Sequence, residues 1–118
     1  EYGANVRAKL AGWETIPEPG GYQLFAPIID TYLKEHLFAD IFVRDVLDFQ
    51  SRELVTISAL ASMTGTAGQL WFHLGAAMNV GLSEEQIQSF IAALKEKVGE
   101  KEAVGAKAVF EKVLSGKA

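Results

Sequence analysis

Two apolar segments separated by a glycine-containing turn constrain the fold of this chain most. Residues 49–63 and 67–80 carry apolar side chains at helical spacing, and Gly65 lies between them. Glycine commonly follows the last residue of a helix, and Thr66 is of a type that caps the next helix. The sequence therefore predicts two antiparallel helices joined by a short turn. The apolar face of the first helix is expected to hold Leu54, Ile57, Leu60 and Ala61.

Helical spacing recurs in the rest of the chain, and no segment alternates in polarity as a strand does. The further helices are expected at residues 2–10, 23–44, 84–98 and 102–114, with a loop over residues 12–22. Ser83 and Gln86 have the spacing of a capping box at the start of one of them. The last helix is expected to direct Val104, Ala108, Val109 and Val113 inward.

These features predict an all-α fold of about five to six helices. The length of 118 residues favours a single domain over residues 1–118, in which residues 1–22 are less regular. Two of the helices are more apolar than a monomer requires, which favours self-association.

Composition excludes several classes of function. The net charge of −4 argues against a nucleic-acid partner, because phosphate binding requires excess Lys and Arg. The sequence has no run of 18 apolar residues, which a membrane span would require, and it shows no signal peptide. A cytoplasmic location is therefore expected. The chain has no cysteine, which excludes disulfides and thiol redox chemistry.

Two ionisable residues, Glu53 and His73, interrupt the apolar helices of the hairpin. Burial of such groups costs several kcal/mol unless they are paired or neutralised, so the two residues are expected to interact or to have a function. A turn centred near Gly65 sets Glu53 opposite Ala77, about one helical turn, or roughly 5 Å, from His73. A purely structural hydrogen bond between the two helices is the alternative.

Several separated motifs occur together in this sequence: 37–42 (LFADIF), 52–57 (RELVTI), Gln69-Leu70, His73 and 77–82 (AMNVGL). With these motifs the chain resembles the carboxymuconolactone decarboxylase family, whose all-helical fold is shared with alkylhydroperoxidase D. The resemblance implies a helical protomer in a homo-oligomer, commonly a trimer or hexamer, with sites near subunit contacts.

The resemblance implies one of two activities. In the peroxidase branch of the family a C-x-x-C pair lies between the Glu and the His, but residues 58–72 contain no cysteine, so peroxidase activity is predicted to be absent. In the decarboxylase branch the substrate is a small unsaturated lactone with a carboxylate, and its conjugated carbonyl accepts the released electrons without a cofactor. A non-enzymatic oligomer that binds a ligand or a partner protein is a further alternative.

The decarboxylase reading assigns roles to six residues. His73 suits the general acid or base, because the ordinary pKa of histidine is about 6.5, and Glu53 could orient it or shuttle its proton. His36, with Tyr32 and Asp40 as its neighbours one turn away, is a third candidate for this site. Candidate substrate contacts are Arg44 and Arg52, as partners of a carboxylate, and Trp71, as part of an aromatic wall.

Each of the last four residues also has a structural reading. Salt bridges or helix-end contacts are the alternative for the two arginines, a surface position for His36, and a core or interface position for Trp71. No metal site is predicted, because the sequence has no H-x-x-E or H-E-x-x-H spacing.

Overall fold

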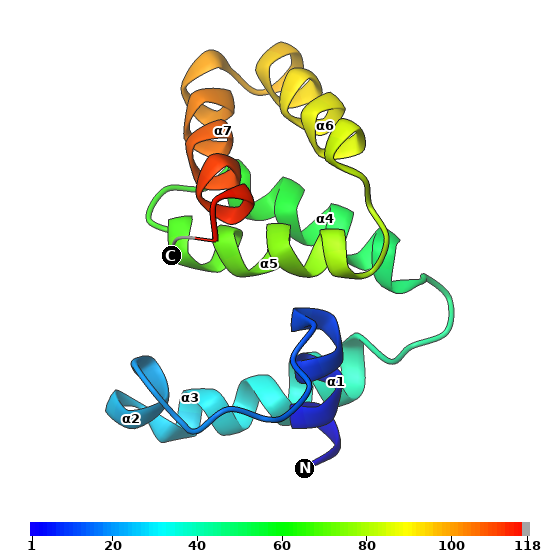
Figure 1. Ribbon diagram of the computed structural model, residues 1–118, viewed down its shortest axis with the longest axis vertical. Coiled ribbons are helices and arrows are strands. Elements are labelled where there is room, and N and C mark those ends of the chain that lie inside the picture. The colour runs from blue at the N-terminus through cyan, green and yellow to red at the C-terminus, as the bar shows by residue number, and fades with distance from the viewer. Residues whose placement is uncertain (117–118) are drawn as a thin grey trace. The chain divides into compact units, whose positions relative to one another are not determined.

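All regular structure is helical in residues 1–116, the part of the chain that the computed structural model describes. The predicted all-α class is therefore confirmed, although seven α-helices and one π-helix replace the five or six helices expected (Figure 1). The chain divides into two compact units, residues 1–48 and residues 49–118. None of the helices in residues 1–116 has the length and hydropathy that a bilayer-spanning segment needs.

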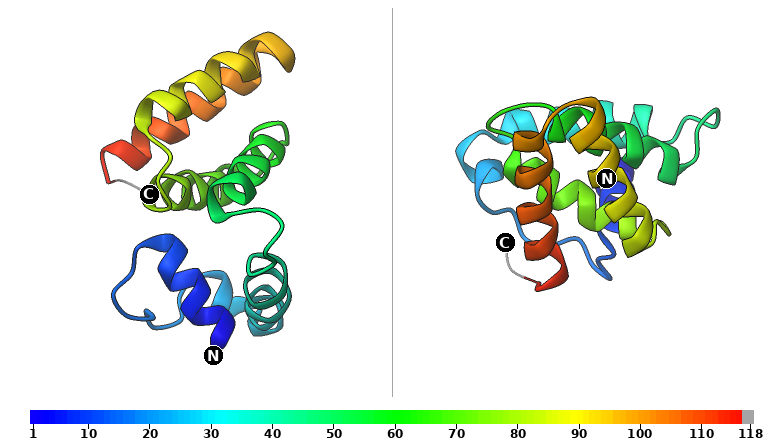
Figure 2. Two further views of the ribbon diagram at one scale, coloured as in Figure 1. Left: turned by 90° about the vertical axis from the view of Figure 1, so that its right-hand side faces the viewer. Right: turned by 90° about the horizontal axis from the view of Figure 1, so that it is seen from above.

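The first unit begins with the predicted short helix, α1 (Tyr2–Ala11). Gly12 ends α1 in the left-handed conformation, with a φ of 70°, which glycine adopts without a steric penalty. α1 packs against η1, the π-helix Leu33–Ile41 (Figure 2). At Gly3 the two backbones meet so closely that a Cβ atom would overlap the carbonyl group of Lys34.

The helix predicted over residues 23–44 is interrupted, and that prediction of one continuous helix is wrong. α2 (Tyr22–Phe25) ends at Ala26, whose φ of −139° and ψ of 74° are not helical, and α3 (Pro27–Tyr32) then begins. The reason is local, because the proline ring disfavours helical geometry in the residue before it. Pro27 thus starts a new helix, where its missing N–H is tolerated.

η1 continues directly from α3 but with wider turns. The amide of Phe42 donates to the carbonyl oxygen of Leu37, five residues earlier, at 2.9 Å. Phe38 and Phe42, which are both buried, place their ring centroids 5.8 Å apart.

The second unit opens with the predicted hairpin of α4 (Phe49–Ala61) and α5 (Ala67–Asn79), which run antiparallel (Figure 1). Gly65 has the positive φ of 76° that the turn requires. Thr66 precedes α5, but its hydroxyl does not cap that helix. Instead the hydroxyl donates to the carbonyl oxygen of Leu60 at 2.7 Å, and it thereby satisfies an acceptor at the end of α4.

The hairpin is followed by α6 (Glu84–Lys97) and α7 (Glu100–Leu114), and α7 begins two residues before the predicted start. The predicted capping box is confirmed. The amide of Gln86 donates to Ser83 Oγ at 3.1 Å, and the amide of Ser83 donates to Gln86 Oε1 at 2.8 Å. α7 packs against α6, α5 and α4.

All four helices contribute to the core of the second unit. Its buried members are Ile57, Ala61, Leu70, Leu74, Ala77, Ile87, Leu94, Ala106 and Phe110. Leu54, which was predicted on the apolar face of its helix, is 43% exposed. In the last helix the inward predictions for Val104, which is 58% exposed, and for Ala108, which is also exposed, are wrong.

The face that α7 buries is instead defined by Ala103, Ala106 and Phe110. Phe110 carries more apolar area than a valine, so its burial determines the rotation of the helix about its axis. Val104 is left exposed beside this face.

Candidate active site

The buried face of α4 begins with a carboxylate. Glu53, Ile57 and Ala61 follow one another at intervals of four residues and are all buried, and Glu53 is 0% exposed. The face that a helix buries in a core normally consists of apolar residues. Glu53 therefore needs a partner or a function.

The partner is His73, which lies on the buried face of α5 beside Leu74 and Ala77. His73 Nδ1 lies 2.8 Å from Glu53 Oε2, so the predicted interaction between the two side chains is present. When the carboxylate is ionised, Nδ1 carries the proton and donates it in this hydrogen bond. The second ring nitrogen, Nε2, is then the atom that can exchange a proton with another molecule.

The second oxygen of Glu53 is different. Within residues 1–116, Oε1 is buried and has no hydrogen-bond partner. Buried acceptors are nearly always satisfied, so an unsatisfied one calls for a proton, a water molecule or a ligand. The carboxyl group thus holds the histidine with one oxygen and keeps the other available.

His73 is also held by its neighbour on α5. The ring of Phe72 meets the His73 ring edge to face, with centroids 5.0 Å apart. The His73 side chain is 10% exposed, whereas the Glu53 side chain is fully buried. Of the two groups, only the histidine ring reaches solvent, and it is therefore the one able to touch a substrate.

The hairpin around this pair is tied at both ends. The Gln50 amide at the start of α4 donates to the carbonyl oxygen of Val80 after α5, at 2.8 Å. At the opposite end is the bond from Thr66 to Leu60. These two bonds hold the register in which Glu53 meets His73. Sequence reasoning missed Gln50, because an amide side chain in a first helical turn has no distinctive pattern.

His36 and Arg44 belong to the first unit, where both interact with Asp40. Asp40 Oδ2 lies 3.5 Å from His36 Nδ1 and 3.3 Å from Arg44 Nη2. The ring of Tyr32 lies 5.1 Å from that of His36, so the predicted neighbours are in contact. All three charged side chains are about half exposed, which makes these ion pairs weak.

Arg52 and Trp71 lie on α4 and α5 and are half-buried. Arg52 directly precedes Glu53 on α4, and Trp71 lies two positions before His73 on α5. On a helix, neighbours at these spacings point to different sides, by about 100° and 200°. Their own helices therefore direct Arg52 and Trp71 away from the direction of Glu53 and His73.

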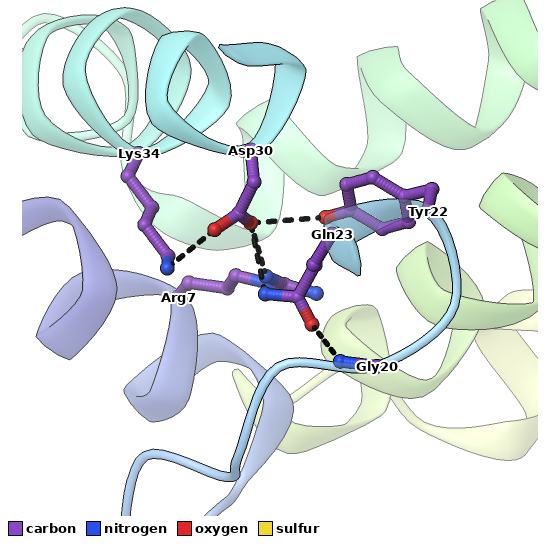
Figure 3. Close-up of polar contacts among 6 residues, drawn as sticks. All are labelled: Arg7, Gly20, Tyr22, Gln23, Asp30 and Lys34. Carbon is purple, nitrogen blue, oxygen red and sulfur yellow. Dashed lines mark hydrogen bonds and ion pairs between the residues drawn. The ribbon is translucent and has the colours of Figure 1, made fainter. Parts of the chain in front are cut away.

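A second buried carboxylate, Asp30, was not predicted. Four side chains surround it (Figure 3). Oδ1 accepts hydrogen bonds from Gln23 at 2.9 Å, Arg7 at 3.3 Å and Tyr22 at 3.4 Å, and Oδ2 lies 2.5 Å from Lys34 Nζ. Both oxygens of Asp30 are thus satisfied within the chain, in contrast to Glu53, and the cluster serves to join α1 to α2 and α3.

The Asp30 cluster also alters acidity. Burial acts to raise the pKa of Asp30, but the hydrogen bonds from Lys34 and Gln23, together with the charges of Lys34 and Arg7, outweigh it and hold the pKa below its ordinary value of 3.8. Burial raises the pKa of the Tyr22 hydroxyl, against the nearby charge of Arg7. The guanidinium of Arg7 lies 5.4 Å from the ring of Trp13 and 5.9 Å from that of Tyr22.

No group of three or more His, Cys, Asp or Glu side chains that could hold a metal ion occurs in residues 1–116. The candidate site consists of the carboxylate of Glu53 and the imidazole of His73. This arrangement can orient a histidine and transfer a proton.

Comparison with known proteins agrees with the fold and the motifs. The model of the carboxymuconolactone decarboxylase family matches residues 28–112, which include Glu53 and His73. No match was found among curated proteins.

Proposed function

Because this chain belongs to the carboxymuconolactone decarboxylase family, we propose that it is a cofactor-independent decarboxylase, or a related acid/base lyase. Its substrate would be a small carboxylated lactone such as 4-carboxymuconolactone. The observation that carries the proposal is the contact of 2.8 Å between the buried carboxylate of Glu53 and the His73 ring.

The chemistry requires little besides a proton donor. When the bond between the carboxylate and the ring carbon breaks, carbon dioxide leaves. The electron pair then moves through the conjugated double bond to the lactone carbonyl. The resulting enolate then takes up a proton at one of its ring carbons, and this protonation completes the reaction. The substrate acts as its own electron acceptor, so the protein has to supply the proton and to hold the negative charges.

His73 is proposed to deliver that proton from Nε2 of its imidazolium form, in which both ring nitrogens carry a proton. Glu53 is proposed as its positioning residue, since a carboxylate on Nδ1 fixes the orientation of the ring and stabilises its positive charge. The unsatisfied Oε1 of Glu53 supports a site that accepts a further donor, such as a buried water molecule.

His36 remains a candidate third residue of the acid/base site, and Arg44, Arg52 and Trp71 remain candidates for substrate contact. A homo-oligomer, a trimer or a hexamer, is part of the proposal. Its support is the apolar surface of α2 and α3, where Leu24, Phe25, Ile28 and Tyr32 are exposed. In such an assembly, residues of a neighbouring subunit could complete the site.

The direct test is turnover of 4-carboxymuconolactone by the purified protein, measured as carbon dioxide release. His73→Ala is expected to lower kcat/KM by at least about 100-fold, the usual contribution of a general acid. Glu53→Gln keeps the size of the side chain and is expected to give a smaller loss. Ser89→Ala, at an exposed position of α6, is the control and should retain full activity.

Helicity and thermal unfolding measured on the same variants separate a catalytic from a structural pair. A structural hydrogen bond predicts a loss of about 1 to 3 kcal/mol in stability for His73→Ala, with no turnover in the unmodified protein. Turnover that persists in His73→Ala would remove this residue from the mechanism. Peroxide reduction is expected to be absent, because the chain has no cysteine.

A further inference from the structure

The outward face of α7 carries apolar residues that the core does not use. Val104 and Leu114 are 58% and 47% exposed. Between them, Lys107 and Glu111 are also exposed. The intervals of three, four and three residues place all four side chains on one face of the helix.

This face borders a groove between α6 and α7, which lie side by side (Figure 2). The groove has a volume of about 690 Å³, and its lining includes Ile91 and Ala92 from α6 and Ala103 and Phe110 from α7. Small and apolar side chains in the lining allow another helix to approach closely. Charged residues, Lys107 and Glu111 among them, also line the groove, and we refer to their exposed side chains as its edge.

Along the chain the side chains on this face are apolar, basic, acidic and apolar, and in reverse they are apolar, acidic, basic and apolar, so the two charges exchange places. Positions 104 and 114 are equally distant from position 109, and so are positions 107 and 111. A second α7 that lies antiparallel and is centred at this position therefore brings Val104 opposite Leu114. The same alignment brings Lys107 opposite Glu111. A two-fold contact contains each of these pairs twice, because a residue of either copy meets its counterpart in the other copy.

The charges are free to make such pairs. Neither the Lys107 nor the Glu111 side chain takes part in an ion pair within residues 1–116. Lys95 and Glu100, which also border the groove, lie 3.0 Å from each other and so satisfy one another. The edge of the groove is thus left with one unpaired positive and one unpaired negative charge, which makes it complementary to itself.

We infer that the groove between α6 and α7 receives the α7 helix of a second copy of this chain, in a two-fold symmetric contact. Val104 and Leu114 bury their exposed surface against each other there, and Lys107 pairs with Glu111 of the partner subunit. This contact specifies one interface of the homo-oligomer proposed above. It involves neither Glu53 nor His73, so it can be tested independently of the activity.

Charge exchange on the full-length chain tests the contact, with molar mass measured by light scattering after size exclusion. Lys107→Glu makes both edge charges negative and Glu111→Lys makes both positive. Each variant alone is expected to lose the two-fold contact, and its molar mass should fall to half that of the unmodified protein. Mixing the two variants should restore the original mass, since the acidic copy then meets the basic one. The double variant Lys107→Glu/Glu111→Lys should restore it as well.

Lys112→Glu provides the matched control, because it makes the same charge change at another exposed position of α7. Its mass should not change. Circular dichroism verifies that each variant keeps its helices. An unmodified protein that is a monomer, or an oligomer with an odd number of subunits, would contradict the inference. So would a Lys107→Glu variant of unchanged mass, or a mixture of the two variants that does not associate.

Discussion

Two buried carboxylates differ in how completely the chain satisfies them. Asp30 receives four side chains, from α1, α2 and η1, and both its oxygens have partners. Glu53 has one partner, His73, and an oxygen without any within residues 1–116. A fully satisfied group stabilises the fold, whereas a partly satisfied one retains capacity for a ligand or a proton. This difference makes Glu53 and His73 the better candidates for function.

Replacement of Asp30 should mainly affect stability. Asp30→Asn leaves Arg7 and Lys34 without their anion, so the free energy of unfolding should fall by about 1 to 3 kcal/mol near neutral pH. Asp40→Asn is the matched control. Asp40 also lies one turn from basic partners, but its side chain is 52% exposed, so that change should cost less than about 1 kcal/mol. Urea unfolding followed by circular dichroism measures both.

The same pair of variants has a defined pH dependence. The pKa of Asp30 is lower in the folded state than its ordinary value of 3.8, so its stabilisation is complete above that value. It is lost as the pH falls through the lower pKa of the folded state. The difference in stability between the unmodified protein and Asp30→Asn should therefore shrink on acidification below about pH 4. A difference that stays constant with pH would show that the charge of Asp30 is not the cause.

At the scale of the elements, one close approach between helices allows the first unit to form. α1 packs against η1, and Gly3 is the residue at which the backbone of α1 lies on the Lys34 carbonyl group. Any side chain at this position would have to displace the main chain rather than a flexible side chain. The contact therefore depends on glycine for reasons of space.

Gly3→Ala is expected to separate α1 from η1 and to destabilise the first unit by about 1 to 3 kcal/mol, as overpacking commonly does. Gly68→Ala tests the specificity of the effect. Gly68 is likewise the second residue of its helix, α5, but a Cβ there meets no atom within 4 Å. Its replacement should leave stability unchanged or raise it by less than about 1 kcal/mol. Equal effects of the two changes on thermal unfolding would contradict this account.

At the scale of the molecule, the second unit has one core to which all four of its helices contribute. Leu74 lies within it and is fully buried. A cavity at this position should weaken the contacts of all four helices together. Leu74→Ala should therefore lower the stability of this unit by about 2 to 5 kcal/mol. Leu54→Ala, at an exposed position of α4, should cost less than about 1 kcal/mol in the same denaturant titration. A loss confined to one helix, measured by hydrogen exchange, would contradict a shared core.

Local signals account for the successful predictions. The capping box of Ser83 and Gln86 and the turn at Gly65 depend on residues within a few positions of each other. The contact between Glu53 and His73 was also predictable, because antiparallel helices joined by a short turn have a known register. The break at Ala26 had a local signal too, in Pro27, but helical spacing on both sides concealed it.

The incorrect or missing predictions concern the rotation of helices about their axes and contacts between residues that are distant in the sequence. Several apolar residues of α7 could have faced inward, and the large ring of Phe110 was buried at the expense of Val104. Asp30 and Lys34 are spaced one helical turn apart and could have been paired from sequence. Arg7, 23 residues from Asp30, could not have been. The wide turns of η1 shift each hydrogen bond by one residue, and no residue type marks that shift.

The sequence by itself determined the all-α class, the helical hairpin with its buried acid and base, and the exclusion of thiol chemistry, since these depend on residue type and short-range spacing. Only the tertiary structure decided which face each helix buries, because that choice depends on the fit of side chains from distant segments. For the same reason it alone distinguished the satisfied carboxylate of Asp30 from the unsatisfied one of Glu53. The exposure of Val104 and Leu114 on α7 likewise follows from the burial of Phe110 in the core.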